Sequence, residues 1–231
     1  MKIRPTHFVS LPLQSTGQCI ESIRETQRAI VEADAQLAEM TIPTCRFHIS
    51  LGFLSIQPEF AAESIRTITQ ALEDVCRDCA HFDVILGTVK SFPGGQVIYT
   101  APMERSLGLH RLKASIDKKL SAISSSRCAA GDDSFRYCGH AGAHWKPHIT
   151  IAKVKQAALS NKRGNGGSHM MKGKEECEPR LSIPISCYSK VQNNQFGTAV
   201  FDVVQLCAMK PDSKSQVGYS VRASVPLSGR T

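Results

Sequence analysis

The chain has 231 residues, of which 42% are hydrophobic and 21% are charged; this composition is typical of a folded globular protein and excludes a disordered one. No apolar run approaches the ~20 residues that a membrane-spanning helix requires, and the N-terminus has no apolar signal-peptide stretch. The formal net charge of +8 favours a polyanionic partner such as nucleic acid, and the nine cysteines, an odd number, favour free thiols. We therefore expect a protein of the cytosol or nucleus that does not bind a membrane.

Hydrophobic periodicity predicts alternating strands and helices along the first half of the chain. In chain order it predicts a strand over 6–13, a helix over 19–39, a strand over 45–54, a helix over 58–80, a strand over 82–89 and a hairpin partner from residue 97. The second half repeats this order loosely, with a helix over 105–123, a loop over 124–134, a strand over 146–154, a surface insertion over 160–180, and strands over 181–190, 198–208 and 217–227. Helices mixed with hairpins predict an α+β fold with a mostly antiparallel sheet, in a single domain over 1–231.

Two short segments, 100 residues apart, have the same pattern. One is Phe47-His48-Ile49-Ser50-Leu51 and the other is Pro147-His148-Ile149-Thr150-Ile151. Successive side chains of a strand point to opposite faces, so each histidine shares a face with the hydroxyl residue two positions later, while the apolar residues point into the core. We predict one site built from these two halves.

Two imidazoles and two hydroxyls are groups that suit phosphodiester chemistry. One neutral histidine takes a proton from the attacking hydroxyl and the other, protonated, donates to the leaving oxygen, since the ordinary imidazole pKa of ~6.5 lies near working pH. The Ser and Thr hydroxyls donate hydrogen bonds to the non-bridging oxygens. These steps require no metal ion and no other cofactor, so we predict none.

Strand alternation also places one cation beside each histidine. Arg46 shares a face with His48, and Lys146 shares a face with His148. Both cations are candidates for binding phosphates through charge-assisted hydrogen bonds, and the alternative is that they are solvated residues at strand ends.

Two aromatic residues are candidates for contacts with a nucleobase. Phe8 lies on the face of its strand opposite the core positions, so it either stacks on a base or packs in the core. Tyr219 is the second candidate, although its phase groups it with Val217 and Val221.

The paired motifs resemble the signature of the two-histidine (2H) phosphoesterase superfamily. Their flanks narrow the resemblance to the central, 2′,5′-phosphodiesterase-like domain of A-kinase anchoring protein seven. These flanks are Arg4-Pro5-Thr6-His7-Phe8-Val9, Trp145-Lys146-Pro147 and the stretch from Phe196-Gly197-Thr198 to Gly218-Tyr219. The resemblance covers nearly the whole chain apart from 160–180. It implies a bilobal fold in which two mostly antiparallel sheets, backed by helices, surround a central cleft.

The resemblance also implies nucleotide binding and the cleavage of 2′,5′-linked oligoadenylates, with catalysis by His48, Ser50, His148 and Thr150. The alternatives are a 2′,3′-cyclic phosphodiesterase, an enzyme that trims RNA 3′ ends, and a non-catalytic module that binds AMP or another nucleotide. The kinase-binding helix of the anchoring protein lies beyond this domain, and no such helix follows the last predicted strand here, so kinase anchoring is not expected. We expect a monomer, and the sequence identifies no protein partner.

Overall fold

The computed structural model describes residues 4–13, 17–140, 145–154, 182–210 and 217–229, and the insertion predicted over 160–180 lies outside them. No helix among the described residues is both long enough and apolar enough to cross a bilayer. The cysteines within these ranges are all free thiols.

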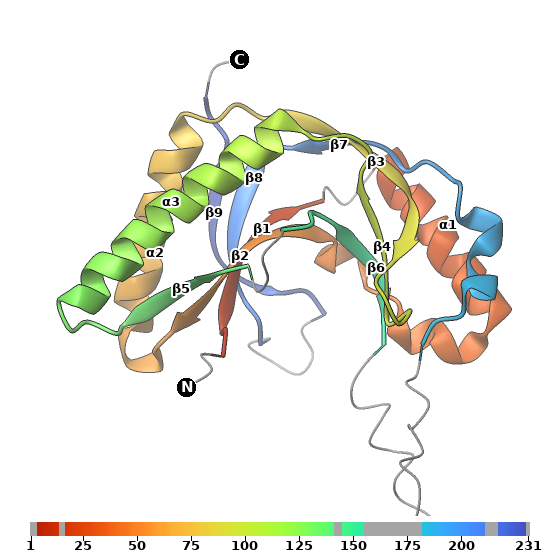
Figure 1. Ribbon diagram of the computed structural model, residues 1–231, viewed down its shortest axis with the longest axis horizontal. Coiled ribbons are helices and arrows are strands. Elements are labelled where there is room, and N and C mark those ends of the chain that lie inside the picture. The colour runs from red at the N-terminus through yellow and green to blue at the C-terminus, as the bar shows by residue number, and fades with distance from the viewer. Residues whose placement is uncertain (1–3, 14–16, 141–144, 155–181, 211–216, 230–231) are drawn as a thin grey trace, which may run out of the picture.

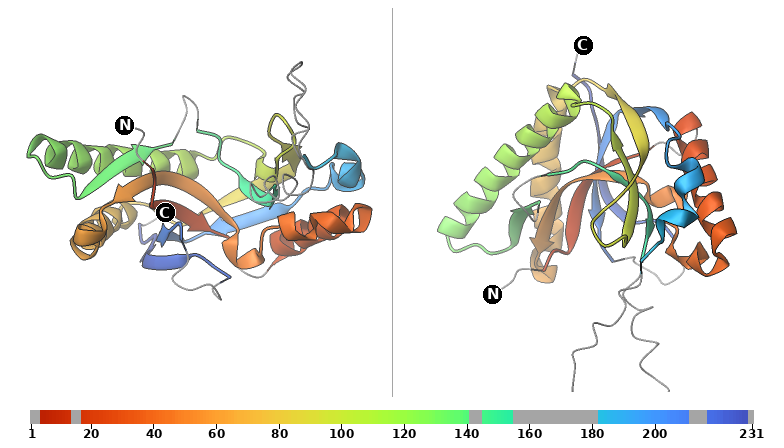
Figure 2. Two further views of the ribbon diagram at one scale, coloured as in Figure 1. Left: turned by 90° about the horizontal axis from the view of Figure 1, so that it is seen from below. Right: turned by 45° about the vertical axis from the view of Figure 1, so that its right-hand side comes forward.

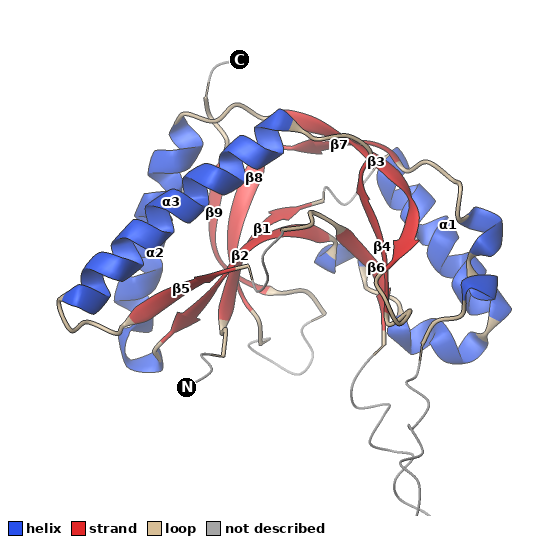
Figure 3. Ribbon diagram, viewed as in Figure 1, coloured by secondary structure: helices blue, strands red, loops and turns tan. Residues whose placement is uncertain are grey.

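The described strands form one curled antiparallel sheet of nine strands that has two halves (Figures 1 and 3). The first half has the order β7-β3-β4-β6, which are Gly197–Phe201, Phe82–Ser91, Val97–Pro102 and Ile149–Lys153. The second half has the order β2-β1-β8-β9, with β5 beside β2; these are His48–Ile56, His7–Pro12, Val203–Ala208, Ser220–Pro226 and Phe135–Gly139. The two halves meet where β2 pairs with β6.

Each half of the sheet is covered by its own helices. On the first half, α1 (Gln18–Ala33) packs against β7 and β6; on the second half, α2 (Ala61–Arg77) packs against β9 and α3 (Leu107–Ala129) packs against β5. Figure 1 shows α1 on one side of the molecule and α2 with α3 on the other, and the two views of Figure 2 show the same separation. This arrangement confirms the predicted α+β fold, with the difference that the two expected helix-backed sheets are joined into one through β2 and β6.

The predicted alternation of the motif strands is found in the structure. Five of the six apolar residues that flank the motif side chains are buried, namely Phe47, Ile49, Leu51, Ile149 and Ile151, whereas Pro147 is only partly buried because it precedes β6. The helix predicted over 105–123 is found as α3. Leu109, Leu112, Ile116 and Leu120 lie at helical spacing and are buried, and Ser106 caps the helix by accepting a hydrogen bond from the Leu109 amide. The two motif strands are therefore fixed by core packing on one face.

The strand predicted over 181–190 is wrong. The chain there forms two 3₁₀ helices, η5 (Ile185–Cys187) and η6 (Ser189–Val191). Pro184 precedes η5 and has no amide hydrogen for a strand ladder, and the buried Cys187 and Tyr188 pack on the core from these turns. The apolar residues that led to the prediction of a strand are thus buried, but from 3₁₀ helices instead of a strand.

The loop predicted over 124–134 is wrong in its first half, since α3 continues to Ala129, and β5 was not predicted at all. Side-chain contacts at its C-terminal end, one of them to α2, explain the longer helix. Arg127, in its last turn, donates hydrogen bonds to Asp132 (2.8 Å), Ser134 (2.9 Å) and Thr67 (3.1 Å), and these bonds fix the end of α3. Periodicity does not register such contacts.

The other differences concern boundaries. The helix predicted over 19–39 ends at Ala33, where Asp34 accepts a hydrogen bond from the Gln36 amide and starts the 3₁₀ helix η1 (Ala35–Met40). The helix predicted over 58–80 is α2, preceded by the 3₁₀ helix η3 (Pro58–Phe60). The strand predicted over 198–208 is two strands, β7 and β8, which belong to different halves of the sheet.

Candidate active site

The two motifs meet at their central isoleucines, since Ile49 pairs antiparallel with Ile149. In an antiparallel pair, the residue before one partner faces the residue after the other, so this register places His48 opposite Thr150. The other two motif residues face each other in the same way. Side chains directly opposite each other have Cβ atoms roughly 4.5–5.5 Å apart. Because both isoleucines are fully buried, all four motif side chains lie on the opposite face of the sheet from them.

The backbone before the first motif fixes the ring of His48. Its Nδ1 lies 2.7 Å from the carbonyl oxygen of Arg46, and its Nε2 lies 3.0 Å from Ser50 Oγ. A carbonyl oxygen can only accept, so Nδ1 carries the proton of the neutral ring and donates it. Nε2 then has a free lone pair, which accepts a hydrogen bond from the Ser50 hydroxyl.

The ring of His148 is fixed in the same way. Its Nδ1 lies 2.8 Å from the carbonyl oxygen of Lys146, two residues earlier in the chain. This bond again assigns the ring proton to Nδ1 and leaves Nε2 as the basic nitrogen. The two histidines therefore present the same atom, in the same tautomer, to the face they share.

Both histidines are neutral in the free protein at neutral pH. Burial lowers the pKa of His48 to about 4, the bond to the Arg46 carbonyl opposes this shift, and charge on His148 adds to it. Burial also lowers the pKa of His148, with the Lys146 carbonyl opposing and the positive charge of Lys153 adding to the shift. An anion bound between the two rings would raise both pKa values, because an opposite charge favours the protonated form.

Each histidine contacts one phenylalanine and one tyrosine. The His48 ring centroid lies 5.0 Å from Phe8 and 5.2 Å from Tyr219. The His148 ring lies 5.0 Å from Phe92, just after β3, and 5.4 Å from Tyr99 on β4. Phe8 and Tyr99 come from the strands that pair with the two motif strands.

The sequence prediction named Phe8 and Tyr219 but missed Phe92 and Tyr99. Of the two alternatives for Phe8, the structure shows core packing, because its side chain is only 3% exposed. A signal for Tyr99 existed, because the predicted hairpin strand from residue 97 takes the same place beside the second motif that the strand over 6–13 takes beside the first. Tyr219 lies just before β9, so strand phase does not apply to it; its ring contacts Phe8 at 4.8 Å, whereas Val217 and Val221 are exposed.

The two predicted cations have different surroundings. Arg46 donates a hydrogen bond from Nε to the carbonyl oxygen of Val217, and its guanidinium carbon lies 5.3 Å from the Tyr219 ring centroid. Arg46 therefore holds the segment before β9 against the first motif. The Lys146 side chain is exposed and has no hydrogen bond or ion pair to another described residue.

Trp145 links the segment before His148 to the first motif. Its indole Nε1 donates a hydrogen bond of 3.0 Å to the carbonyl oxygen of Ser50. The ammonium of Lys113, on α3, lies 5.5 Å from the indole ring centroid, so the ring is also held from the helix side. This hydrogen bond is a second connection between the two motifs, in addition to the pairing of Ile49 with Ile149.

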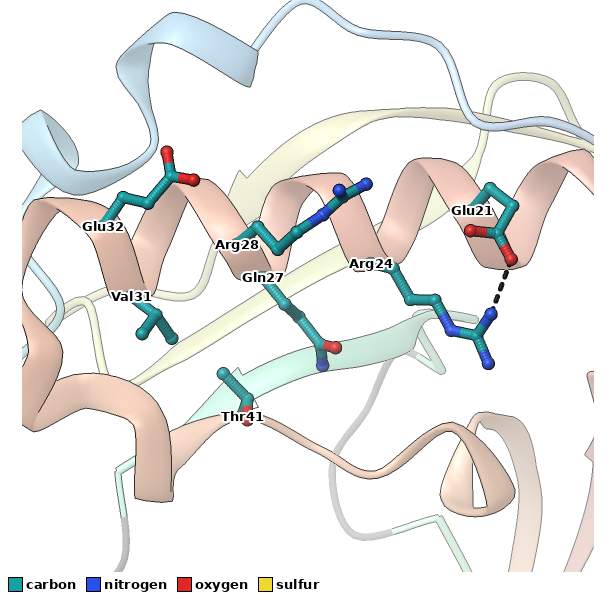
Figure 4. Close-up of a pocket in the computed structure, with 7 residues that line it drawn as sticks. All are labelled: Glu21, Arg24, Gln27, Arg28, Val31, Glu32 and Thr41. Carbon is teal, nitrogen blue, oxygen red and sulfur yellow. Dashed lines mark hydrogen bonds and ion pairs between the residues drawn. The ribbon is translucent and has the colours of Figure 1, made fainter.

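Two further features of the described residues lie outside the motifs. Among the described residues, no three His, Cys, Asp or Glu side chains gather closely enough to hold a metal ion. A hollow of about 550 Å³ lies on α1 (Figure 4). It is lined by Glu21, Arg24 and other residues of α1 together with Thr41, none of which belongs to either motif. Its Arg24–Glu21 ion pair is internal to the helix.

A curled antiparallel sheet in which two His-x-Ser/Thr motifs face each other defines the class of two-histidine phosphoesterases. The chain belongs to one family of this class, the AKAP7 2′5′ RNA ligase-like domain, whose model matches residues 5–227.

Solved structures share the fold. TT0787 of Thermus thermophilus is 18% identical with a TM-score of 0.58, over 98% of this chain and 100% of that one. E. coli LigT complexed with 3′-AMP is 13% identical with a TM-score of 0.54, over 96% of this chain and 98% of that one. No curated protein sequence matches the chain.

Proposed function

We propose that the protein is a metal-independent phosphodiesterase that cleaves 2′,5′-linked oligoadenylates by acid and base catalysis. The observation that carries the proposal is the antiparallel pairing of the two motifs, in which each histidine faces a hydroxyl residue of the other motif. Both imidazoles present Nε2 to one face of the sheet. An acid and a base on either side of one phosphate are the groups that displacement at phosphorus requires.

The proposed reaction follows from these atoms. A neutral Nε2 takes the proton of the attacking hydroxyl, which belongs to water or to the adjacent ribose, while the P–O bond to the leaving ribose oxygen breaks. The protonated Nε2 of the other histidine donates its proton to that oxygen. Ser50, whose hydroxyl donates to His48 in the free protein, turns to the phosphate and frees the basic nitrogen. Ser50 and Thr150 then donate to the non-bridging oxygens, where negative charge accumulates.

Three observations support an adenylate substrate with this linkage. The family is that of a 2′5′ RNA ligase-like domain. E. coli LigT, which shares the fold, has been solved with 3′-AMP and with ATP. The partly exposed rings of Tyr219 beside one histidine, and of Phe92 and Tyr99 beside the other, suit stacking on bases. We also propose that the protein acts as a monomer in the cytosol or nucleus.

The test is a product assay on matched 2′,5′- and 3′,5′-linked triadenylates, with and without EDTA, that resolves cyclic from linear phosphate ends. We expect the 2′,5′ linkage to be cleaved at least about tenfold faster, with no effect of EDTA. Loss of cleavage in EDTA would contradict the metal-independent mechanism. 2′,3′-cyclic AMP is assayed as a third substrate; its faster hydrolysis would instead assign a cyclic phosphodiesterase, and preference for the 3′,5′ linkage would assign RNA 3′-end trimming.

A binding module is distinguished in the same experiment. Calorimetry with AMP measures binding without turnover, and the His148→Asn variant supplies the control for contaminating nucleases. Tight AMP binding by a protein that cleaves none of these diesters would contradict an enzymatic function.

A further inference from the structure

A hollow of about 460 Å³ opens next to the second motif, and the proposed reaction does not use it. Its lining includes Lys146 and Pro147, the two residues before His148. It also includes Tyr99, whose ring centroid lies 5.4 Å from that of His148. From there the hollow follows the end of β4 to Arg105, just before α3. Its volume lies within the roughly 300–1,000 Å³ of small-molecule sites.

The lining of this hollow carries an excess of positive charge. Its lining contains the cations Lys90, Arg105 and Lys146 and one carboxylate, Glu104. All three cations are exposed, and none has an ion pair or side-chain hydrogen bond to another described residue. Elsewhere in the described chain, cations such as Lys119 and Arg127 are paired with carboxylates. An excess of cations over carboxylates in one hollow favours an anionic ligand.

Two aromatic rings stand among these cations, and each is held by a neighbour. Tyr99 stacks on Phe92, with ring centroids 4.4 Å apart. Trp145 has the ring of His110 5.4 Å away on one side. Both rings are only partly buried, so part of their surface faces the hollow. Cations interleaved with fixed aromatic rings are the combination that binds single-stranded nucleic acid.

We propose that this hollow is a second nucleotide subsite, which binds the nucleotide adjoining the scissile phosphate on the His148 side. Lys90 and Arg105 bind the phosphate of that nucleotide, and Tyr99 or Trp145 stacks on its base. The inference rests on the proposed function, because it extends the same substrate chain beyond the reacting phosphate. An acidic peptide would satisfy the cations but would leave the two rings without a use, so a nucleotide fits the lining better.

The proposed subsite predicts that the affinity of the protein for an oligoadenylate depends on the length of the oligoadenylate. A 2′,5′-linked triadenylate reaches the hollow with its second phosphate, whereas a diadenylate that bears no terminal phosphate supplies a base but no second phosphate. One additional charge-assisted contact corresponds to about tenfold in affinity. Neutralising two cations should remove this advantage and should reduce the slope of log K against log salt by roughly 1.

The test measures binding of diadenylate and triadenylate to the His48→Asn protein, which prevents turnover. The test variant is Lys90→Gln/Arg105→Gln. The matched control is Arg111→Gln/Lys118→Gln, because it also removes one lysine and one arginine, but from a separate hollow between α2 and α3. Calorimetry gives the affinities. Trp145 is the single tryptophan of the chain, so its fluorescence reports directly on the subsite.

We expect the triadenylate to bind about tenfold tighter than the diadenylate and to quench Trp145 more strongly, with both differences lost in the Lys90/Arg105 variant and retained in the control. Equal affinity of the two ligands, or equal losses in both double variants, would overturn the subsite while leaving the proposed function intact. Hexaglutamate binding as tightly as triadenylate would overturn the choice of a nucleotide. If neither adenylate binds any variant and the wild type cleaves neither, the proposed function fails and the subsite fails with it.

Discussion

The two candidate catalytic histidines are held by the same kind of local hydrogen bond. A histidine donates from Nδ1 to the carbonyl oxygen two residues earlier, which fixes the tautomer and turns Nε2 towards the shared face. Strand alternation was enough to predict that each histidine and its hydroxyl residue share a face. Strand alternation did not predict the contact with Phe92 or the lowered pKa values of the two histidines. Both depend on how far the imidazole rings are buried, and that burial comes from segments far away in the chain.

The lowered pKa values of His48 and His148 predict an acidic pH optimum. The free enzyme must hold one histidine neutral and the other protonated, and kcat/KM reports these free-enzyme pKa values. Because burial lowers both pKa values below 6.5, to about 4 for His48, the protonated form becomes scarce as pH rises. We expect kcat/KM for a 2′,5′-linked diadenylate to peak below pH 6.5 and to fall steadily from pH 6.5 to 8. A rate that is constant or rising over this range would contradict the assigned protonation states.

At the level of elements, the site depends on how β2 and β6 are held together. Their ladder has one residue pair, Ile49 with Ile149, and the Trp145–Ser50 bond reinforces it from the segment before β6. Lys113 lies against the same indole and pairs with Asp117, which accepts a hydrogen bond from Tyr137 on β5. A chain of polar contacts therefore runs from β5 through α3 to the second motif.

Removing the indole donor should misplace the motifs without unfolding the protein. In Trp145→Phe the ring is kept, but the Ser50 carbonyl oxygen loses the hydrogen bond. We expect kcat for a diadenylate to fall about tenfold with little change in KM, because an error in position mainly affects the transition state. Lys113→Met keeps the hydrogen bond but removes the ammonium beside the ring, so comparing the two variants separates the effect of the bond from that of the cation. A thermal shift accompanied by unchanged kcat would show that Trp145 is only structural.

Gly52 on β2 provides a separate test of the same chain of contacts. A Cβ at this position would lie 2.8 Å from Tyr137 Cε2, closer than packed side chains tolerate. We expect Gly52→Ala to lower the free energy of unfolding by about 1–3 kcal/mol, since overpacking displaces Tyr137 from Asp117. Gly218→Ala, whose Cβ would meet its nearest neighbour at 3.9 Å, is the control in a denaturant titration. Equal stability of the two variants would contradict the close packing of Tyr137.

Over the whole molecule, the sequence predicted most elements and the motif positions, but not the assembly of the sheet. Each half combines strands that lie far apart in the chain; β1, for example, pairs with β2 on one side and with β8 on the other. Periodicity identifies which face of a strand is buried and does not say which strands are neighbours. The resemblance supplied the bilobal plan, whereas the register of Ile49 with Ile149 and the link through Trp145 required the structure.

The most direct test of the account compares His48→Asn, His148→Asn and the double variant in cleavage of a 2′,5′-linked diadenylate, with unfolding followed by circular dichroism. If the two histidines act as one acid–base pair, each single variant should lose at least about 10³-fold in kcat, and the double variant should lose little more, because partners in one proton relay are not additive. All three should unfold at temperatures close to that of the wild type. A single variant that retains substantial activity, or losses that multiply in the double variant, would contradict the paired mechanism.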